Sequence, residues 1–364
     1  MEDLLVFEPL VVSSHKGDYQ TYFNNQDLVL NFDDVTIASS HFIIDAAVAE
    51  IYSEQLARVL KSPTASVLII EATEKNKSLD CFPAYVEHLV KNKLRRNQRL
   101  IAIGGGIIQD ITCFLAATML RGVEWWFYPT TLLAQADSCI GSKSSINCGS
   151  IKNILGTFTP PQKIFIYSFF LNSLNPVDLY SGIGEMLKVH AIEGPVSFDA
   201  IAKDYQNLFS DSSLMLKYMR RSLEIKKGII EQDEFDQELR HVMNYGHTFG
   251  HAIESATQYK IPHGVAVTIG MDMANYVAVK MGLTTQSHYE RMHPVLKVNY
   301  ADFVGENIPL DKFLSAISKD KKNIGDKVSL ILLDKNAKPG KIFSNNDQNF
   351  HHYCASYLES GRLT

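Results

Sequence analysis

The pattern of apolar and polar residues between about residue 40 and residue 170 alternates short apolar runs with longer amphipathic stretches. Three apolar runs predict buried strands, at Phe42–Ile44, Val67–Ile70 and Leu100–Ile103. A helical pattern follows each of them, at Val48–Leu60, Leu79–Val90 and Ile107–Leu120. Strands that alternate with helices of this length predict a parallel sheet with crossover helices, as in a Rossmann-like α/β domain.

The two flanking regions have different patterns. Short apolar runs such as Leu28–Leu30 predict edge strands in the first forty residues, and they indicate no function. Beyond about residue 170 the strands end and long helical patterns follow, at Val177–Glu193, Leu214–Glu231 and Glu238–Ser255. We therefore expect an α/β nucleotide-binding domain at residues 1–170 and a mostly α-helical domain at residues 171–364.

Composition excludes several classes of protein. A hydrophobic fraction of 46% is typical of a well-buried globular chain, and a net charge of -5 gives no electrostatic footprint for nucleic acid or an anionic membrane. No apolar run has the length of a membrane span, and the acidic N-terminus does not resemble a signal peptide. The five cysteines are scattered without a CxxC pair, which favours reduced thiols and a cytoplasmic location.

The stretch Arg240–His251 carries the most informative polar pattern. On a continuous helix, spacings of four, three and four residues place Arg240, Asn244, His247 and His251 within about 60° of one another. A seam of this kind is normally apolar, so it indicates a polar cavity or a metal site. Gly246 and Gly250 thin the same helix at a cost of about 1 kcal/mol each, which indicates that something approaches its backbone closely.

A solvent-facing helix that carries two histidines is the alternative interpretation of this stretch. Two further residues weigh against it: His263 follows Pro262 at an expected helix start, and Glu185 lies in a predicted helix. One Glu with two His is the ligand set of a catalytic zinc site, in which three protein ligands leave a position open for substrate.

Two stretches of the first domain are candidates for anion binding. Gly104–Gly106 lies between a predicted buried strand and a helix, where backbone amides can approach a pyrophosphate, although the spacing is not GxGxxG and a tight structural turn remains the alternative. Residues 128–156 are dense in small and hydroxyl residues with single lysines. This composition suits a loop around an anion, and surface loops share it.

Motifs spread over residues 40–335 resemble, in order, those of 3-dehydroquinate synthases and the wider sugar phosphate cyclase family. They are Gly-Gly-Gly-(x3)-Asp from Gly104, Leu-Arg-Gly from Leu120, Pro-Thr-Thr-Leu-Leu-Ala-Gln-(x)-Asp-Ser from Pro129, Lys-Asn-(x2)-Gly from Lys152, Gly-Glu-(x2)-Lys from Gly184, Asn-(x)-Gly-His-Thr-Phe-Gly-His-Ala-Ile-Glu from Asn244, His-Gly from His263 and Asp-Lys-Lys from Asp320.

The resemblance implies conversion of 3-deoxy-arabino-heptulosonate 7-phosphate to 3-dehydroquinate in the shikimate pathway, with NAD, a divalent metal (zinc first, cobalt second) and a homodimer. In such enzymes a metal-polarised alcohol transfers hydride to NAD, phosphate leaves by β-elimination, the hydride returns and an aldol step closes the ring. The substrate phosphate itself is a candidate base.

The resemblance also implies roles for individual residues. It assigns the metal to Glu185, His247 and His263. It assigns contacts to the phosphate and ring hydroxyls to Lys143, Asn153, Lys188, Asn244, His251 and Lys322, with Lys321 as a substitute for Lys322. Arg121 is expected to reach a phosphate across a dimer interface, and Lys226 with Arg240 to hold the substrate carboxylate. The cofactor residues are expected to be Asp45, Glu74, Lys77, Gly104, Gly105, Gly106, Asp110, Thr130, Thr131 and Asp137.

Two departures from the family pattern bear on the substrate. The usual Gly-Gly-Lys-Thr-Gly-Ile-Asn is Gly-Ser-Lys-Ser-Ser-Ile-Asn at Gly141–Asn147, and Val265 replaces a Glu expected to support His263. Alternatives therefore include a cyclase related to 2-epi-5-epi-valiolone or amino-dehydroquinate synthase, a metal-dependent polyol dehydrogenase, and a catalytically silent binding homologue. Arg240 favours a substrate with a carboxylate.

Overall fold

The computed structural model describes residues 7–24, 30, 32–149 and 151–363, which form two compact units. The first unit comprises residues 1–174 and 219–235, and the second comprises residues 175–218 and 236–364. The segment Met219–Phe235 thus belongs with the first unit, whereas the sequence pattern placed it with everything after residue 170. Helix α8, Ser212–Ile230, begins in the second unit and ends in the first.

A seven-stranded sheet with the order β1-β2-β9-β6-β5-β3-β4 organises the first unit. Only the pair β1–β2 is antiparallel; all the other neighbours are parallel. The strands are β1 Leu10–Val12, β2 Tyr19–Asn24, β3 Ser40–Asp45, β4 Ser66–Ile70, β5 Arg99–Gly104, β6 Glu124–Pro129 and β9 Lys163–Tyr167. A separate antiparallel hairpin pairs β7 Ile146–Cys148 with β8 Ile151–Leu155.

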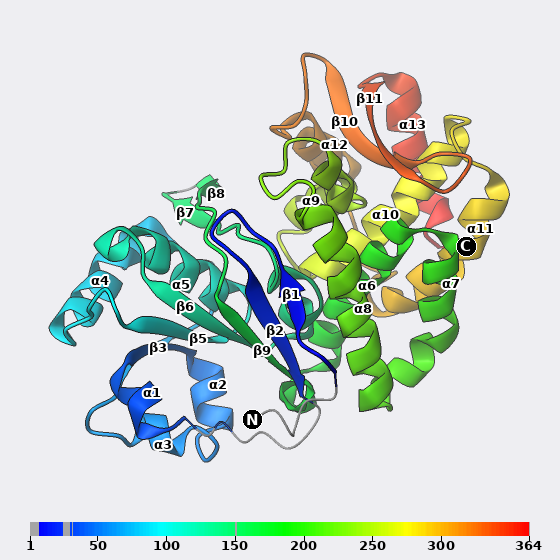
Figure 1. Cartoon of the computed structure of the whole chain (residues 1–364). Helices are drawn as coiled ribbons and strands as arrows, with labels where there is room; N and C mark the ends of the chain where they lie inside the picture. The colour runs from blue at the N-terminus through cyan, green and yellow to red at the C-terminus, as the bar shows by residue number, and fades with distance from the viewer. Residues whose placement is uncertain (1–6, 25–29, 31, 150, 364) are drawn as a thin grey trace. The chain divides into compact units, whose positions relative to one another are not determined.

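Two of the three predicted apolar runs, Phe42–Ile44 and Leu100–Ile103, lie on interior strands and are completely buried. The expectation of a buried strand is wrong for Val67–Ile70, which lies on the edge strand β4, where Ile69 is 52% exposed. Continuous burial is expected when helices cover both faces of a parallel sheet. Figure 1 shows α4 and α5 on one face and α1 to α3 on the other. The described residues of the run at Leu28–Leu30 include only Leu30, which is not in a strand.

The helical segments of the first unit are α1 Asp34–Ala38, α2 Ala46–Ile51, α3 Ala57–Leu60, α4 Phe82–Lys91 and α5 Gly106–Thr118, the 3-10 turns η2 Leu79–Cys81, η3 Met119–Arg121 and η5 Ser168–Ser173, and the π-turn η4 Ala134–Ser138. The prediction of a single helix at Val48–Leu60 is wrong. Helix α2 ends at Ile51, and the hydroxyl of the buried Tyr52 donates a hydrogen bond to Ser173 Oγ at 2.8 Å.

The second unit is mainly helical. Its segments are α6 Pro176–Glu193, α7 Pro195–Asp204, α9 His247–Ala256, α10 His263–Lys280, α11 Gln286–Asn299, α12 Leu310–Ser318 and α13 Gln348–Ser356, with the shorter turns η6 Tyr205–Phe209, η7 Leu239–Asn244, η8 Ala301–Phe303 and η9 Tyr357–Gly361. The expectation that strands end near residue 170 is wrong in one place: β10 Lys327–Leu333 and β11 Pro339–Asn345 form an antiparallel hairpin. β10 is buried along most of its length, so a short apolar run there is a strand packed on helices.

Helix α10 is the centre of the second unit, because nearly all of its side chains from Gly264 to Ala278 are buried. Glycines let α6 and α9 approach its backbone. A Cβ on Gly264 would lie 1.9 Å from the Ser181 carbonyl oxygen on α6, and one on Gly270 would lie 2.1 Å from the Gly246 carbonyl oxygen. The expected close approach at Gly246 and Gly250 is therefore made by a neighbouring helix.

Gly246 also corrects the prediction of a continuous helix at Glu238–Ser255. Gly246 has a left-handed φ of +78°. The 3-10 turn η7 ends before Gly246, and helix α9 begins directly after it. A side chain there would meet Met271 Cγ at 2.6 Å, so the break and the close packing require the same glycine. Arg240 and Asn244 consequently lie on a 3-10 turn, and His247 and His251 on a separate helix.

Among the described residues, no helix has both the length and the apolar composition that crossing a membrane requires.

The helix crossing predicts that Gly264→Ala destabilises the protein severely. The new methyl group would overlap the Ser181 carbonyl, which costs about 3 kcal/mol or more when neither backbone can move. Gly228→Ala in α8 is the matched control, since its Cβ would meet nothing within 4 Å. This substitution should raise the free energy of unfolding by up to about 1 kcal/mol. The urea midpoints of both variants test this, and equal midpoints would contradict it.

Candidate functional site

Three helices of the second unit bring one carboxylate and two imidazoles together. Glu185 lies on α6, and His247 and His263 are the first residues of α9 and α10. Glu185 Oε1 is 3.8 Å from His247 Nε2 and 3.5 Å from His263 Nε2. Tetrahedral zinc ligands lie about 3.4 Å apart, so the spacing suits one divalent ion with little adjustment.

A hydrogen bond to the backbone fixes the tautomer of His247. His247 Nδ1 lies 3.2 Å from the Tyr245 carbonyl oxygen, which can only accept, so Nδ1 carries the proton and the Nε2 lone pair is directed at Glu185. Burial, with help from Lys188, holds the pKa of His247 well below its usual value and keeps the ring neutral. A neutral imidazole with a fixed tautomer is the form that binds a metal.

A carboxylate also supports His263, contrary to the expectation drawn from Val265. His263 Nδ1 lies 3.3 Å from each carboxylate oxygen of Glu254, on α9. Burial opposes the charged ring, but Glu254 outweighs it and raises the pKa of His263. Glu254 follows His247 and His251 at helical spacing, so the sequence carries a signal for this carboxylate, which lies on a different helix from His263.

His251 gives a second ligand set. Nitrogens of His247, His251 and His263 lie within 4.8 Å of one another, and His251 is the exposed member of the three. The set predicted from the sequence is therefore brought together, and it competes on geometry with a set of three histidines.

Other predicted substrate residues of the second unit lie in polar contacts. Lys188 Nζ is 2.5 Å from Glu185 Oε2, and both side chains are almost fully buried. Lys322 Nζ donates to Asn244 Oδ1 at 3.0 Å. Arg240 is 7% exposed on η7, four residues before Asn244.

In the first unit, the glycine turn and its neighbours lie at the carboxyl ends of adjacent strands. Asp45 ends β3 and caps α2, Gly104 ends β5, and Thr130 follows β6 and donates its amide to the Gly104 carbonyl at 3.0 Å. Side chains on Gly104 or Gly105 would collide with Ile108 and Thr131, so the tight-turn interpretation accounts for those two glycines. Gly106 opens α5 into free space, where an anion can meet the helix N-terminus.

Lys77 links residues that were assigned to different ligands. Its Nζ lies 3.2 Å from Asp110, 3.1 Å from Asn153 Oδ1 and 3.5 Å from Glu74. Burial raises the pKa of Asp110 to about 6, and Lys77 opposes that shift. Asn147, which the sequence interpretation did not assign, donates to Glu74 at 2.8 Å.

Lys226 pairs with a residue predicted to bind the cofactor. Its Nζ lies 2.6 Å from Asp137 Oδ1 and donates to the Asp137 carbonyl at 2.6 Å. Both residues belong to the first unit and Arg240 to the second, so the expected Lys226–Arg240 pair is not a contact within one unit.

Lys143 and Arg121 are both exposed. Lys143 forms an antiparallel bridge with Phe158 at the base of the β7–β8 hairpin. Arg121 stands in a row of left-handed residues, with φ values of 51° at Leu120, 63° at Arg121 and 122° at Gly122.

Two family models match consecutive parts of the chain. The 3-dehydroquinate synthase N-terminal model matches residues 67–181, and the 3-dehydroquinate synthase C-terminal model matches residues 182–323. The chain belongs to the 3-dehydroquinate synthase family. A 3-dehydroquinate synthase from Campylobacter concisus (strain 13826) is 36% identical over 296 residues, which are 80% of this chain and 84% of the relative. One from Alkaliphilus metalliredigens (strain QYMF) is 34% identical over 80% of this chain and 82% of its own.

Solved structures share the fold of this family member. A 2-deoxy-scyllo-inosose synthase complexed with carbaglucose-6-phosphate, NAD+ and Co2+ matches with a TM-score of 0.81 and 21% identity, over 96% of this chain and 99% of that one. A 2-epi-5-epi-valiolone synthase from Streptomyces hygroscopicus with NAD+ and Zn2+ bound matches with a TM-score of 0.81 and 24% identity, over 94% and 97%. An iron-containing alcohol dehydrogenase reaches a TM-score of 0.59 at 12% identity, over 98% and 99%.

The two ligand sets predict opposite results for two substitutions. If Glu185, His247 and His263 hold the ion, Glu185→Gln lowers zinc affinity by at least about a hundredfold, whereas His251→Ala retains one ion per chain. Zinc content after dialysis, with circular dichroism to check folding, measures both. Retention in Glu185→Gln together with loss in His251→Ala would identify the three histidines as the ligands.

Glu254 gives a separate prediction. Glu254→Gln preserves the shape of the side chain but removes the charge beside His263 Nδ1, so zinc affinity should fall about ten- to a hundredfold. Titration against a chelating indicator measures the change. Glu290→Gln, on the exposed part of α11, is the control. Equal affinities in the two variants would show that Glu254 does not support the ligand.

Proposed function

We propose that the chain is a 3-dehydroquinate synthase that converts 3-deoxy-arabino-heptulosonate 7-phosphate into 3-dehydroquinate and phosphate, with NAD and a divalent ion, zinc before cobalt. Family membership over residues 67–323 is the observation that carries the proposal. It is supported by the Glu185, His247 and His263 cluster, which has the donor set and spacing for the ion.

Glu185, His247 and His263 would hold the ion, which when bound polarises a substrate alcohol for hydride transfer to NAD. On the proposal, Lys188 donates to the hydroxyl that loses its proton, because its ammonium is fixed beside Glu185. Asn244 and Lys322 orient ring hydroxyls as a hydrogen-bonded pair. His251, next to the cluster, is assigned to the same substrate and not to the metal.

The first unit would supply the cofactor and phosphate contacts. Asp45, Gly104–Gly106, Thr130 and Thr131 lie at the strand ends where nucleotides bind in open parallel sheets. Lys143 offers an exposed ammonium to the phosphate. Asn153 and Asp110 meet at Lys77, so the residues assigned to substrate and to cofactor are held by one cation.

A second cyclase activity, on a sugar phosphate without a carboxylate, is the competing function. The altered loop Gly141–Asn147 is the observation that favours it. Arg240 favours the carboxylate substrate, because a buried guanidinium on η7 can form charge-assisted hydrogen bonds with a substrate carboxylate. A polyol dehydrogenase has no use for Lys143, Asn153 and Lys322.

We further propose a homodimer in the cytoplasm. Left-handed residues such as Leu120 and Arg121 cost of order 1–3 kcal/mol each, which suits a turn that is kept to present Arg121 to a neighbouring subunit. All five cysteines are free, as expected in a reducing compartment. The molecular mass in solution and cell fractionation test these two statements.

Turnover of two substrates tests the proposal. The wild type should release phosphate from the heptulosonate phosphate without net NADH, and should act poorly on sedoheptulose 7-phosphate. Arg240→Ala should lower kcat/KM for the first substrate by at least about a hundredfold, roughly 3 kcal/mol, because the substrate carboxylate loses its charge-assisted bonds. Arg291→Ala, which breaks a surface pair with Asp199, is the control.

Three outcomes would contradict the assignment. Turnover of the carboxylate-free sugar alone indicates another cyclase, net accumulation of NADH indicates a dehydrogenase, and neither product indicates a binding protein.

A further inference from the structure

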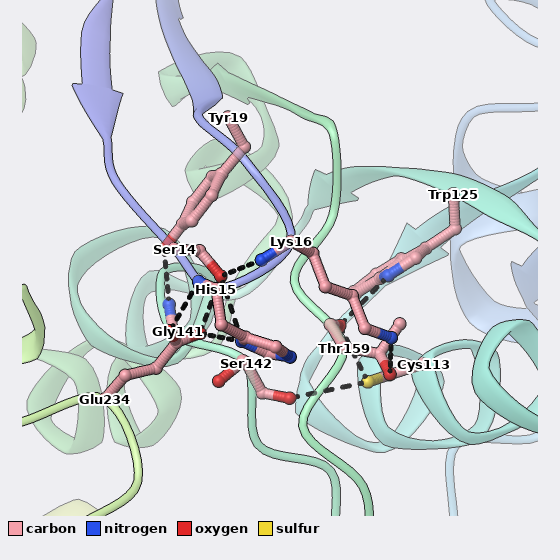
Figure 2. A network of polar contacts seen from close by, with 10 residues as sticks. All are labelled: Ser14, His15, Lys16, Tyr19, Cys113, Trp125, Gly141, Ser142, Thr159 and Glu234. Atoms are coloured by element: carbon pink, nitrogen blue, oxygen red, sulfur yellow. Dashed lines mark hydrogen bonds and ion pairs between the residues drawn. The ribbon is translucent and has the colours of Figure 1, made fainter. Parts of the chain in front are cut away.

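The turn Ser13–Asp18 between β1 and β2 lies outside the residues that the family models match, and its sequence indicates no function. In the structure it is the meeting point of two segments of the first unit (Figure 2). One is the loop that begins at Gly141 and carries Lys143. The other is Met219–Phe235, which carries Lys226.

Tyr19, at the end of this turn, holds the start of the loop. Its hydroxyl accepts a hydrogen bond from the Gly141 amide at 2.9 Å, and both residues are buried. Gly141 has a φ of +107°, so the chain changes direction there in a conformation that favours glycine. The Tyr19 bond therefore fixes the turn two residues before Lys143.

The residues around Lys143 are paired with a second strand of chain. The Thr159 amide donates to the Ser142 carbonyl at 2.6 Å, and the Ser144 amide donates to the Thr157 carbonyl at 3.0 Å. Lys16, from the turn, donates its Nζ to Thr159 Oγ1 at 3.0 Å. The Thr159 carbonyl in turn accepts from Cys113 Sγ and from Trp125 Nε1, each at 3.2 Å. Lys143 thus lies in a short ladder that Lys16 of the turn contacts at Thr159 and Tyr19 of β2 contacts at Gly141.

The turn also binds the residues that directly follow α8. Glu234 accepts from Ser14 Oγ at 2.7 Å and from the His15 amide at 2.9 Å, and Glu231 accepts from the Ser13 amide at 2.8 Å. These are directed polar contacts to carboxylates and are not general apolar packing. They tie the turn to the helix whose Lys226 pairs with Asp137.

We propose that Tyr19 is a positioning residue for substrate binding, and that the turn Ser13–Asp18 acts with it as a clamp that fixes Lys143 for a phosphate. The identity of the ligand rests on the proposed function. The way in which the loop is held does not, because its hydrogen bonds form whatever ligand the loop binds. Without the Tyr19 hydroxyl, the buried Gly141 amide loses its acceptor and the loop samples other conformations.

Tyr19→Phe tests the clamp, with Tyr22→Phe as the matched control. Both residues are on β2, and Tyr22 lies on the opposite face, where its hydroxyl donates to Gln20 Oε1 and its ring stacks on Phe165. Tyr19→Phe should raise KM for the heptulosonate phosphate about tenfold, because a displaced Lys143 binds the phosphate less tightly. The fall in kcat should be smaller and should come from the elimination step, in which the same phosphate leaves. A general loss of folded protein would lower apparent kcat and leave KM unchanged.

Hydrogen–deuterium exchange of the peptide covering residues 139–147 gives a readout independent of substrate. Its uptake should increase in Tyr19→Phe and not in Tyr22→Phe. If the wild type does not turn over the heptulosonate phosphate, the proposed function fails, and the exchange result still decides the clamp. Unchanged exchange, or a KM equal to that of Tyr22→Phe, would overturn the inference.

Discussion

Direct contact between helix backbones is the constraint on which the cluster of Glu185, His247 and His263 depends. Gly264 removes the side chain that would collide with α6, and Gly246 and Gly270 do the same where α9 meets α10. At such crossings the helices approach more closely than side-chain packing permits, and His247 and His263 open α9 and α10. The starts of α9 and α10 and one turn of α6 therefore converge, and no loop is needed to bring Glu185, His247 and His263 together. The glycines that allow the close helix crossings thus also place these three side chains near one another.

The interior of the first unit was predictable because the strands β3 and β5 are buried on both faces. Phe42–Ile44 and Leu100–Ile103 are continuous apolar runs, and such a run followed by an amphipathic stretch has few alternative structures. The errors lie where tertiary contacts override local pattern. Gly246 breaks a helix that periodicity favours, and Tyr52 leaves its helix for a partner in η5. β10 has an apolar run too short to distinguish a strand from a buried helix.

The candidate site divides along the same line. The convergence of Glu185, His247 and His263 could be predicted because these residue types stand in recognisable motifs. The role of Glu254 was not predicted, because Glu254 is not a neighbour of His263 in the sequence. Its carboxylate reaches the His263 imidazole from another helix. The pairing of Lys226 with Asp137 could not be predicted at all. It joins residues 89 apart along the chain, and no periodicity relates them.

Three lysines that are expected to contact the substrate or the cofactor are buried, and this explains why so many of the predicted site residues are carboxylates. Lys77, Lys188 and Lys226 are buried, and each lies within an ion pair to Asp110, Glu185 and Asp137, respectively. A buried ammonium without a counter-charge is unstable. A protein that keeps buried lysines for an anionic substrate therefore needs a carboxylate beside each lysine before the substrate binds. Lys143 differs from these three lysines because its side chain is exposed. Under the proposed clamp, its position depends on the backbone beside it, which is held by the hydrogen bonds of Gly141 to Tyr19 and of Thr159 to Lys16.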